Sequence, residues 1–149
     1  MSDFRVVIQV SPENGLGFLG QGDSLKGIGN YNGALQSYTK AVEIDTSCMQ
    51  QGLMKRGILY LQMKYNDKAL EDFDKLCELA EKESSETQNK TNTNTLTNIQ
   101  SISGSSPQGN TALSKSYFYK AKALKKLNNC NDAILYFEQV IRMCDDQFL

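Results

Sequence analysis

The sequence predicts an all-α protein, a short solenoid of three helix–turn–helix hairpins with a low-complexity insert before the third. Three observations support this prediction. Apolar residues recur at steps of three and four, as on one face of a helix. The same pattern then recurs at a fixed register in three parts of the chain, and a long stretch rich in Ser, Thr and Asn separates the second part from the third. No part of this pattern needs a sheet.

The central hairpin is predicted from two helical segments, near 49–63 and 66–81. Each segment carries an apolar stripe at helical spacing. Between them, residues 64–67 read Lys-Tyr-Asn-Asp, which is too short and too polar for anything but a turn. The two helices therefore form an antiparallel pair, and this hairpin sets the register for the others.

A first hairpin is predicted upstream, after an N-terminal arm of residues 1–14. Residues 4–10 are β-branched and apolar, which favours an extended segment. Residues 11–13, Ser-Pro-Glu, are typical of a helix start, with Ser as the N-cap and Pro in the first turn. The helix that follows contains five glycines, so we expect it to be the weakest. Its partner helix is predicted over 31–45.

The composition changes sharply at residues 84–113, where twenty of the thirty residues are Ser, Thr, Asn or Gln. Such a stretch buries too little apolar surface to offset the entropy of ordering it, so we predict a flexible insert. A phosphorylation tract or binding arm is the alternative to a tolerated loop. The third hairpin is predicted over 114–149, with Ser114 as its cap and a turn at residues 128–129.

The three hairpins align on Ala34, Ala69 and Ala133, which are separated by 35 and 64 residues. The second interval equals one repeat plus the insert. Twelve residues before each alanine is a small residue, and four residues after it is an aromatic one; these are Gly22, Gly57 and Ala121, and Tyr38, Phe73 and Phe137. We expect the small residues to let paired helices approach closely, and each aromatic ring to fill the space against the next hairpin.

A 34-residue hairpin with this pattern resembles the tetratricopeptide repeat (TPR). The resemblance covers about two thirds of the chain, with repeats 1 and 2 in residues 15–83 and repeat 3 near 114–147. The chain departs from the family where a repeat usually has leucine at its seventh position, because Gln21, Arg56 and Lys120 are there instead. The usual tryptophan and the terminal proline are also missing. These departures affect the boundaries of the repeats and leave the fold prediction unchanged.

Composition excludes several classes of protein. The net charge of −1 argues against capture by nucleic acid through overall charge. The four cysteines have no metal-ligand spacing and histidine is absent, so we predict neither a metal site nor a cofactor. No apolar run approaches the roughly 20 residues of a membrane span, and the N-terminus is not a secretory signal. We therefore expect an intracellular, cytoplasmic protein with reduced thiols.

The resemblance implies a concave groove lined by the first helix of each repeat. By register, its floor is apolar and lysines border one end, which suits a peptide or helix with apolar and acidic residues. The predicted groove residues are Leu19, Lys26, Met54, Ile58, Leu61, Lys115, Phe118, Lys122 and Lys125. In the alternative interpretation, Met54 and Ile58 belong to the core and the lysines only solvate a helix face.

Other activities find little support. The acidic residues Glu71, Asp72 and Asp74 are predicted on the outer surface of a helix, and no Gly-rich phosphate loop follows a strand. We therefore predict no catalytic residues. Members of the family that dock chaperones hold a C-terminal carboxylate with Lys, Asn and Arg, and among the matching positions only Lys115 fits, while Asp23 would repel a carboxylate. Nucleic-acid binding lacks aromatic stacking partners other than Phe118.

The sequence therefore predicts a non-catalytic scaffold or adaptor for protein–protein interactions, and a subunit of a larger hetero-oligomeric assembly inside the cell. A cytoskeletal or ciliary scaffold is one such assembly, although no residue selects it. We also expect the second helix of the third repeat to have an uncovered apolar edge, which a partner or further repeats would cover. The alternative is a free regulatory module that binds peptides in the concave groove.

Overall fold

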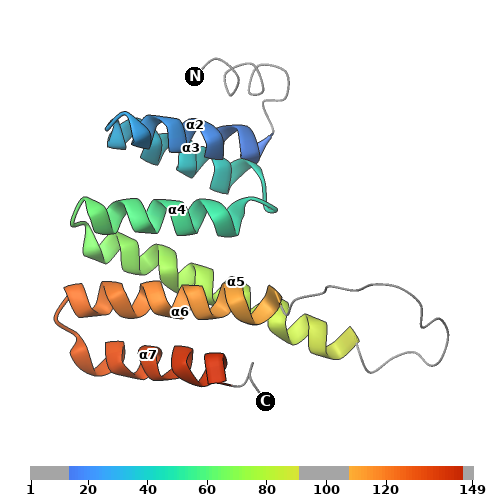
Figure 1. Cartoon of the computed structure of the whole chain (residues 1–149). Helices are drawn as coiled ribbons and strands as arrows, with labels where there is room; N and C mark the ends of the chain where they lie inside the picture. Colours follow the sequence, from blue (N-terminus) through green and yellow to red (C-terminus); the bar gives the residue numbers. More distant parts are fainter. Residues whose placement is uncertain (1–13, 91–107, 146–149) are drawn as a thin grey trace. The chain divides into compact units, whose positions relative to one another are not determined.

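A computed structural model describes residues 14–90 and 108–145. Within these residues the chain forms helices joined by short turns, and the helices fold into hairpins (Figure 1). In chain order they are α2 (Gly15–Gly27), α3 (Tyr31–Ile44), α4 (Met49–Gln62), α5 (Asn66–Lys90), α6 (Gln108–Lys126) and α7 (Cys130–Asp145). The chain divides into two compact units, residues 1–76 and 77–149, which we describe separately.

The helices pair as the sequence predicts. In the first unit α2 packs along α3, and α3 packs against α4; in the second unit α6 packs along α7. The fold prediction of an all-α repeat architecture is confirmed. Among the described helices, none is long and apolar enough to cross a membrane.

All three hairpins turn with the same geometry. The turn residues Gly29, Lys64 and Asn128 have φ angles of +80°, +65° and +61°, the left-handed conformation that commonly ends a helix. In each turn the next residue donates its backbone N–H to a carbonyl oxygen five residues earlier, over distances of 2.9 to 3.0 Å. These bonds satisfy carbonyls that the end of the first helix would leave unpaired. The three repeats therefore share the backbone conformation of their turns as well as their side-chain pattern.

The predicted ends of the insert and the predicted cap of the third hairpin need correction. Helix α5 continues to Lys90 and α6 begins at Gln108, so the helices extend into both ends of the predicted 84–113 insert, and Ser114 is inside α6. The residues beyond 81 include Glu and Lys, which favour a helix, and the Ser85 hydroxyl donates to the carbonyl oxygen of Glu81. The middle of the insert, residues 91–107, and the predicted extended arm lie outside the described residues.

The start of the first helix also differs. Helix α2 begins at Gly15, and the side chain of Asn14 accepts a hydrogen bond of 3.0 Å from the backbone N–H of Leu16. The predicted cap, Ser11, lies outside the described residues. Asparagine is as good an N-cap as serine, so Asn14 can begin the helix without Ser11.

Small residues and aromatic rings meet inside each hairpin of the first unit. A Cβ atom on Gly22 would clash with the ring of Tyr38, and one on Gly57 would lie 2.7 Å from the ring of Phe73. Both rings are buried. The expectation that each ring fills the space against the next hairpin is therefore incomplete, because it first packs against the small residue of its own hairpin. The core around Tyr38 also includes Leu59 of α4.

Candidate functional site: a basic hollow and an exposed helix

The polar residues at the seventh repeat position are each paired with the residue sixteen positions later. The Ser37 hydroxyl donates to Gln21 (3.1 Å), Arg56 binds Asp72, and the Lys120 ammonium lies 4.3 Å from the centre of the Tyr136 ring. All three contacts join the two helices of one hairpin. A polar contact thus replaces the usual leucine packing in every repeat. The common spacing could have revealed this pattern in the sequence.

The Arg56–Asp72 salt bridge is largely shielded from solvent, with side chains that are 18% and 7% exposed. Arg56 donates from Nε and Nη2 to the two Asp72 oxygens over 2.8 and 2.6 Å, and Nη1 donates to Thr39. These hydrogen bonds to Asp72 raise the pKa of Arg56. Asp72 is only 6% exposed, so its predicted place on the outer surface was wrong. The reason is the guanidinium, which supplies the hydrogen bonds that a buried carboxylate needs.

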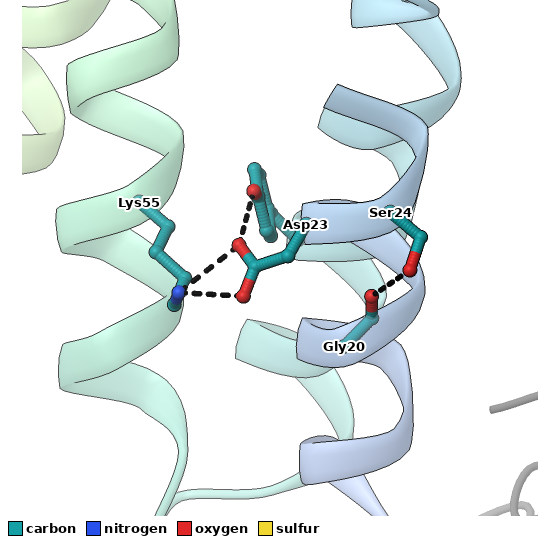
Figure 2. A network of polar contacts seen from close by, with 5 residues as sticks. Gly20, Asp23, Ser24 and Lys55 are labelled. Atoms are coloured by element: carbon teal, nitrogen blue, oxygen red, sulfur yellow. Dashed lines mark hydrogen bonds and ion pairs between the residues drawn. The ribbon is translucent and has the colours of Figure 1, made fainter. Parts of the chain in front are cut away.

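A second polar network connects α2, α3 and α4. Lys55 reaches across to Asp23 and contacts both carboxylate oxygens, at 3.0 and 2.7 Å (Figure 2). The Tyr38 hydroxyl donates to the same carboxylate over 2.7 Å. Burial, the hydrogen bond to Asp23 and the negative charge of Asp23 raise the pKa of Tyr38. Asp23 therefore joins the first hairpin to α4.

The raised pKa of Tyr38 predicts a loss of stability in alkali. The folded protein favours the neutral phenol, so this contribution is intact below the usual tyrosine pKa of about 10 and is lost as the pH rises above it. We expect the Tyr38→Phe variant to lose less stability than the wild type over that range. Urea unfolding between pH 8 and pH 11 measures this difference. Parallel pH curves for the two proteins would show that the phenol is not responsible.

The predicted groove residues of the first unit lie in and around its core. Leu19 is 4% exposed and belongs to a core cluster that includes Leu59 of α4, so its predicted place on the groove floor was wrong. Lys26 is half-buried in the last turn of α2. Met54, Ile58 and Leu61 are half-buried along α4. Half-burial of Met54 and Ile58 does not distinguish the groove interpretation from the core interpretation.

The predicted groove residues of the second unit come together at a surface hollow. This hollow, with a volume of about 470 Å³, is lined by Phe118, Lys122, Lys125, Lys126 and Phe137. Phe118, Lys122 and Lys125 are among the predicted groove residues, and Lys126 follows from the same register, whereas Phe137 was predicted only to pack against a neighbouring hairpin. The rings of Phe118 and Phe137 meet edge to face with their centres 5.9 Å apart. Lys115 is exposed earlier on the same helix.

Charge is strongly uneven around this hollow. Helix α6 contains five lysines and no acidic residue, although the whole chain has a net charge of −1. Within residues 14–90 and 108–145, none of the three lysines lining the hollow takes part in a salt bridge. The hollow therefore combines an aromatic base with uncompensated positive charge, an arrangement that suits an acidic segment with an apolar anchor.

Helix α7 carries a second exposed feature. Ile134, Leu135 and Ile141 are 55%, 57% and 59% exposed. This confirms the expected exposure of apolar side chains on the second helix of the third repeat. Large aliphatic side chains clustered on one helix are more typical of an interaction surface than single exposed residues are.

Comparison with known families identifies the architecture. The tetratricopeptide repeat model matches residues 18–48, 51–83 and 108–147, which is more than half of the chain. The chain belongs to the tetratricopeptide repeat family. The third match begins at residue 108, together with α6, and not at Ser114. The TPR array is a scaffold for protein–protein interaction, so the partners of this chain are proteins.

Two further comparisons complete this picture. No curated protein gave a significant match. Among solved structures, the crystal structure of MamA is similar, with 15% sequence identity, 97% of this chain and 86% of that chain covered, and a TM-score of 0.42. TPR repeats are generally non-catalytic interaction modules. In the part of the chain that the structure describes, no three His, Cys, Asp or Glu residues are grouped as metal ligands.

Proposed function

We propose that this TPR chain is a non-catalytic adaptor and a subunit of a larger hetero-oligomeric assembly in the cytoplasm. The supporting observation is the exposed apolar face of α7. Burying a side chain such as isoleucine contributes about 1.5–3 kcal/mol, so covering several of them favours association. A cytoskeletal or ciliary assembly would fit, as would others, because no described residue favours one over another.

Cross-linking mass spectrometry on the native assembly tests the proposal. We expect cross-links from the lysines of α6 to partner proteins, and an apparent mass well above that of one chain. The Ile134→Glu/Ile141→Glu variant should lose its partners because both changes place charge on the α7 face. Leu16→Glu is the matched control, since Leu16 is equally exposed, at 59%, on α2. Migration of the native protein as a monomer without partners would contradict the proposal.

A second candidate is a free regulatory module that binds peptides. The basic hollow supports it, through Phe118, Lys122 and Lys125, with Lys115 nearby on the same helix. This candidate predicts a monodisperse monomer that binds an acidic peptide saturably. The two functions are thus separated by the hydrodynamic size of the native protein together with peptide titration.

A further inference from the structure

The exposed face of α7 corresponds to a face that is covered in the first hairpin. Val42 of α3 is 7% exposed, and a Cβ atom on Gly52 of α4 would lie 2.5 Å from its Cγ2 atom. The equivalent residue 99 positions later is Ile141, which is 59% exposed. The same repeat position therefore contacts a glycine of the following helix in one hairpin and solvent in the other.

The residues of the basic hollow also correspond to covered residues in the first hairpin. Phe118 and Phe137 are the equivalents of Leu19 and Tyr38 in the first hairpin. There, Leu59 of α4 belongs to the same buried cluster, and Leu19 is only 4% exposed. Phe118 is 44% exposed. The hollow is thus the place where a large apolar side chain of an incoming helix would pack.

The charge at this place is reversed between the two hairpins. Asp23 forms a salt bridge of 2.7 Å with Lys55 of α4. The equivalent of Asp23 in the third hairpin is Lys122, which lines the hollow. A helix that packed on α6 and α7 as α4 packs in the first unit would therefore need an acidic residue where α4 has lysine.

We propose that the α6–α7 surface, formed by Phe118, Lys122, Phe137 and Ile141, binds an amphipathic helix of another protein. The spacing of Gly52, Lys55 and Leu59 in α4 defines that helix. It carries a small residue opposite Ile141, an acidic residue three positions later opposite Lys122, and a large apolar residue four positions after that in the hollow. This inference rests on the proposed adaptor function and specifies the kind of partner.

A second copy of this chain offers no such helix within its described residues, so we take the occupant to be another protein. Within residues 14–90 and 108–145, only Ala69, Asp72 and Leu76 combine a small, an acidic and an apolar residue at this spacing. All three are buried, with 0%, 6% and 3% of their surface exposed. No accessible helix among the described ones can therefore satisfy both the charge of Lys122 and the hollow.

Two matched peptides test the inference on the full chain. One has the sequence of residues 49–63, and the other has the same sequence with Lys55→Glu. Fluorescence anisotropy measures their binding. We expect the Glu peptide to bind about fivefold more tightly than the Lys peptide, because an attractive exposed pair replaces a repulsive one. In the Lys122→Glu variant of the protein this preference should reverse, and Ile141→Asp should weaken both peptides.

Each other outcome overturns the inference. Equal binding of the two peptides would mean that only apolar area is recognised, and equal binding of a scrambled peptide would mean that no helix is recognised. Binding of neither peptide would exclude an α4-like helix, and self-association of the chain in sedimentation would make a second copy the occupant. If the cross-links in the native assembly lie on another surface and neither peptide binds, the adaptor function is supported and the proposed α6–α7 binding site is rejected. Circular dichroism checks that the variants keep their helicity.

Discussion

Replacing Phe73 with alanine is expected to lower the free energy of unfolding by about 3–5 kcal/mol, the largest effect of any single substitution considered. The ring is fully buried and packs against Gly57. Because Gly57 has no side chain, nothing on that side can move in to fill the cavity. Urea unfolding followed by circular dichroism measures the change.

The Gly57→Ala substitution provides a sharper test of this contact. In the wild type the new Cβ would lie 2.7 Å from the Phe73 ring, so we expect destabilisation of about 1–2 kcal/mol despite the better helix propensity of alanine. In the Phe73→Ala background the same change should become stabilising. Gly27→Ala is the control, because a Cβ at Gly27 would meet nothing within 4 Å. An equal effect of Gly57→Ala in both backgrounds would contradict the proposed contact.

Removing the guanidinium of Arg56 should be the next most damaging change. Arg56→Ala leaves the carboxylate of Asp72, 6% exposed, without its cation, and we expect a loss of about 3 kcal/mol in unfolding free energy. The neighbouring Lys55→Ala is the matched control. It breaks the half-exposed bridge to Asp23, whose side chains are 36% and 49% exposed, and should cost less than about 1 kcal/mol.

A double variant distinguishes the stabilisation from the Arg56–Asp72 salt bridge from the cost of burying its two charges. Arg56→Leu restores the residue that the family usually has at this position, and Asp72→Ala removes the carboxylate that would then be left unpaired. We expect the double variant to unfold near the wild-type midpoint, because replacing a buried ion pair by apolar residues is often neutral. If it is as unstable as Arg56→Ala, the salt bridge itself contributes more than its burial costs.

The repeat architecture was predictable because its signals are local and recur. Helical spacing, small residues and aromatic residues appear at one register in all three hairpins, so each copy supports the others. The ends of α5 and α6 were not predictable from composition. Ser, Thr and Asn have low helix propensity, but the last turns of a long helix can continue where residues such as Glu and Lys are interspersed.

The candidate site was predicted in part. Lys122, Lys125 and Phe118 follow from the register of α6 and do line the hollow. Phe137 was assigned only to packing, and Leu19 was assigned to the groove. What decides between these roles is whether the next helix covers the position, and that depends on tertiary packing that a single helix pattern does not contain. Leu19 is covered, whereas Phe118 is not.

The polar pairs at the seventh repeat position disfavour one kind of misfolding, in which helices of different hairpins pair. Repeats of similar sequence can exchange helices, so that the first helix of one hairpin pairs with the second helix of another. Here each hairpin uses a different chemistry at the same position: an amide with a hydroxyl, a guanidinium with a carboxylate, and an ammonium with an aromatic ring. An exchange that placed Gln21 opposite Asp72 would bury a carboxylate without its cation. The three pairs therefore help each first helix to select its own second helix during folding.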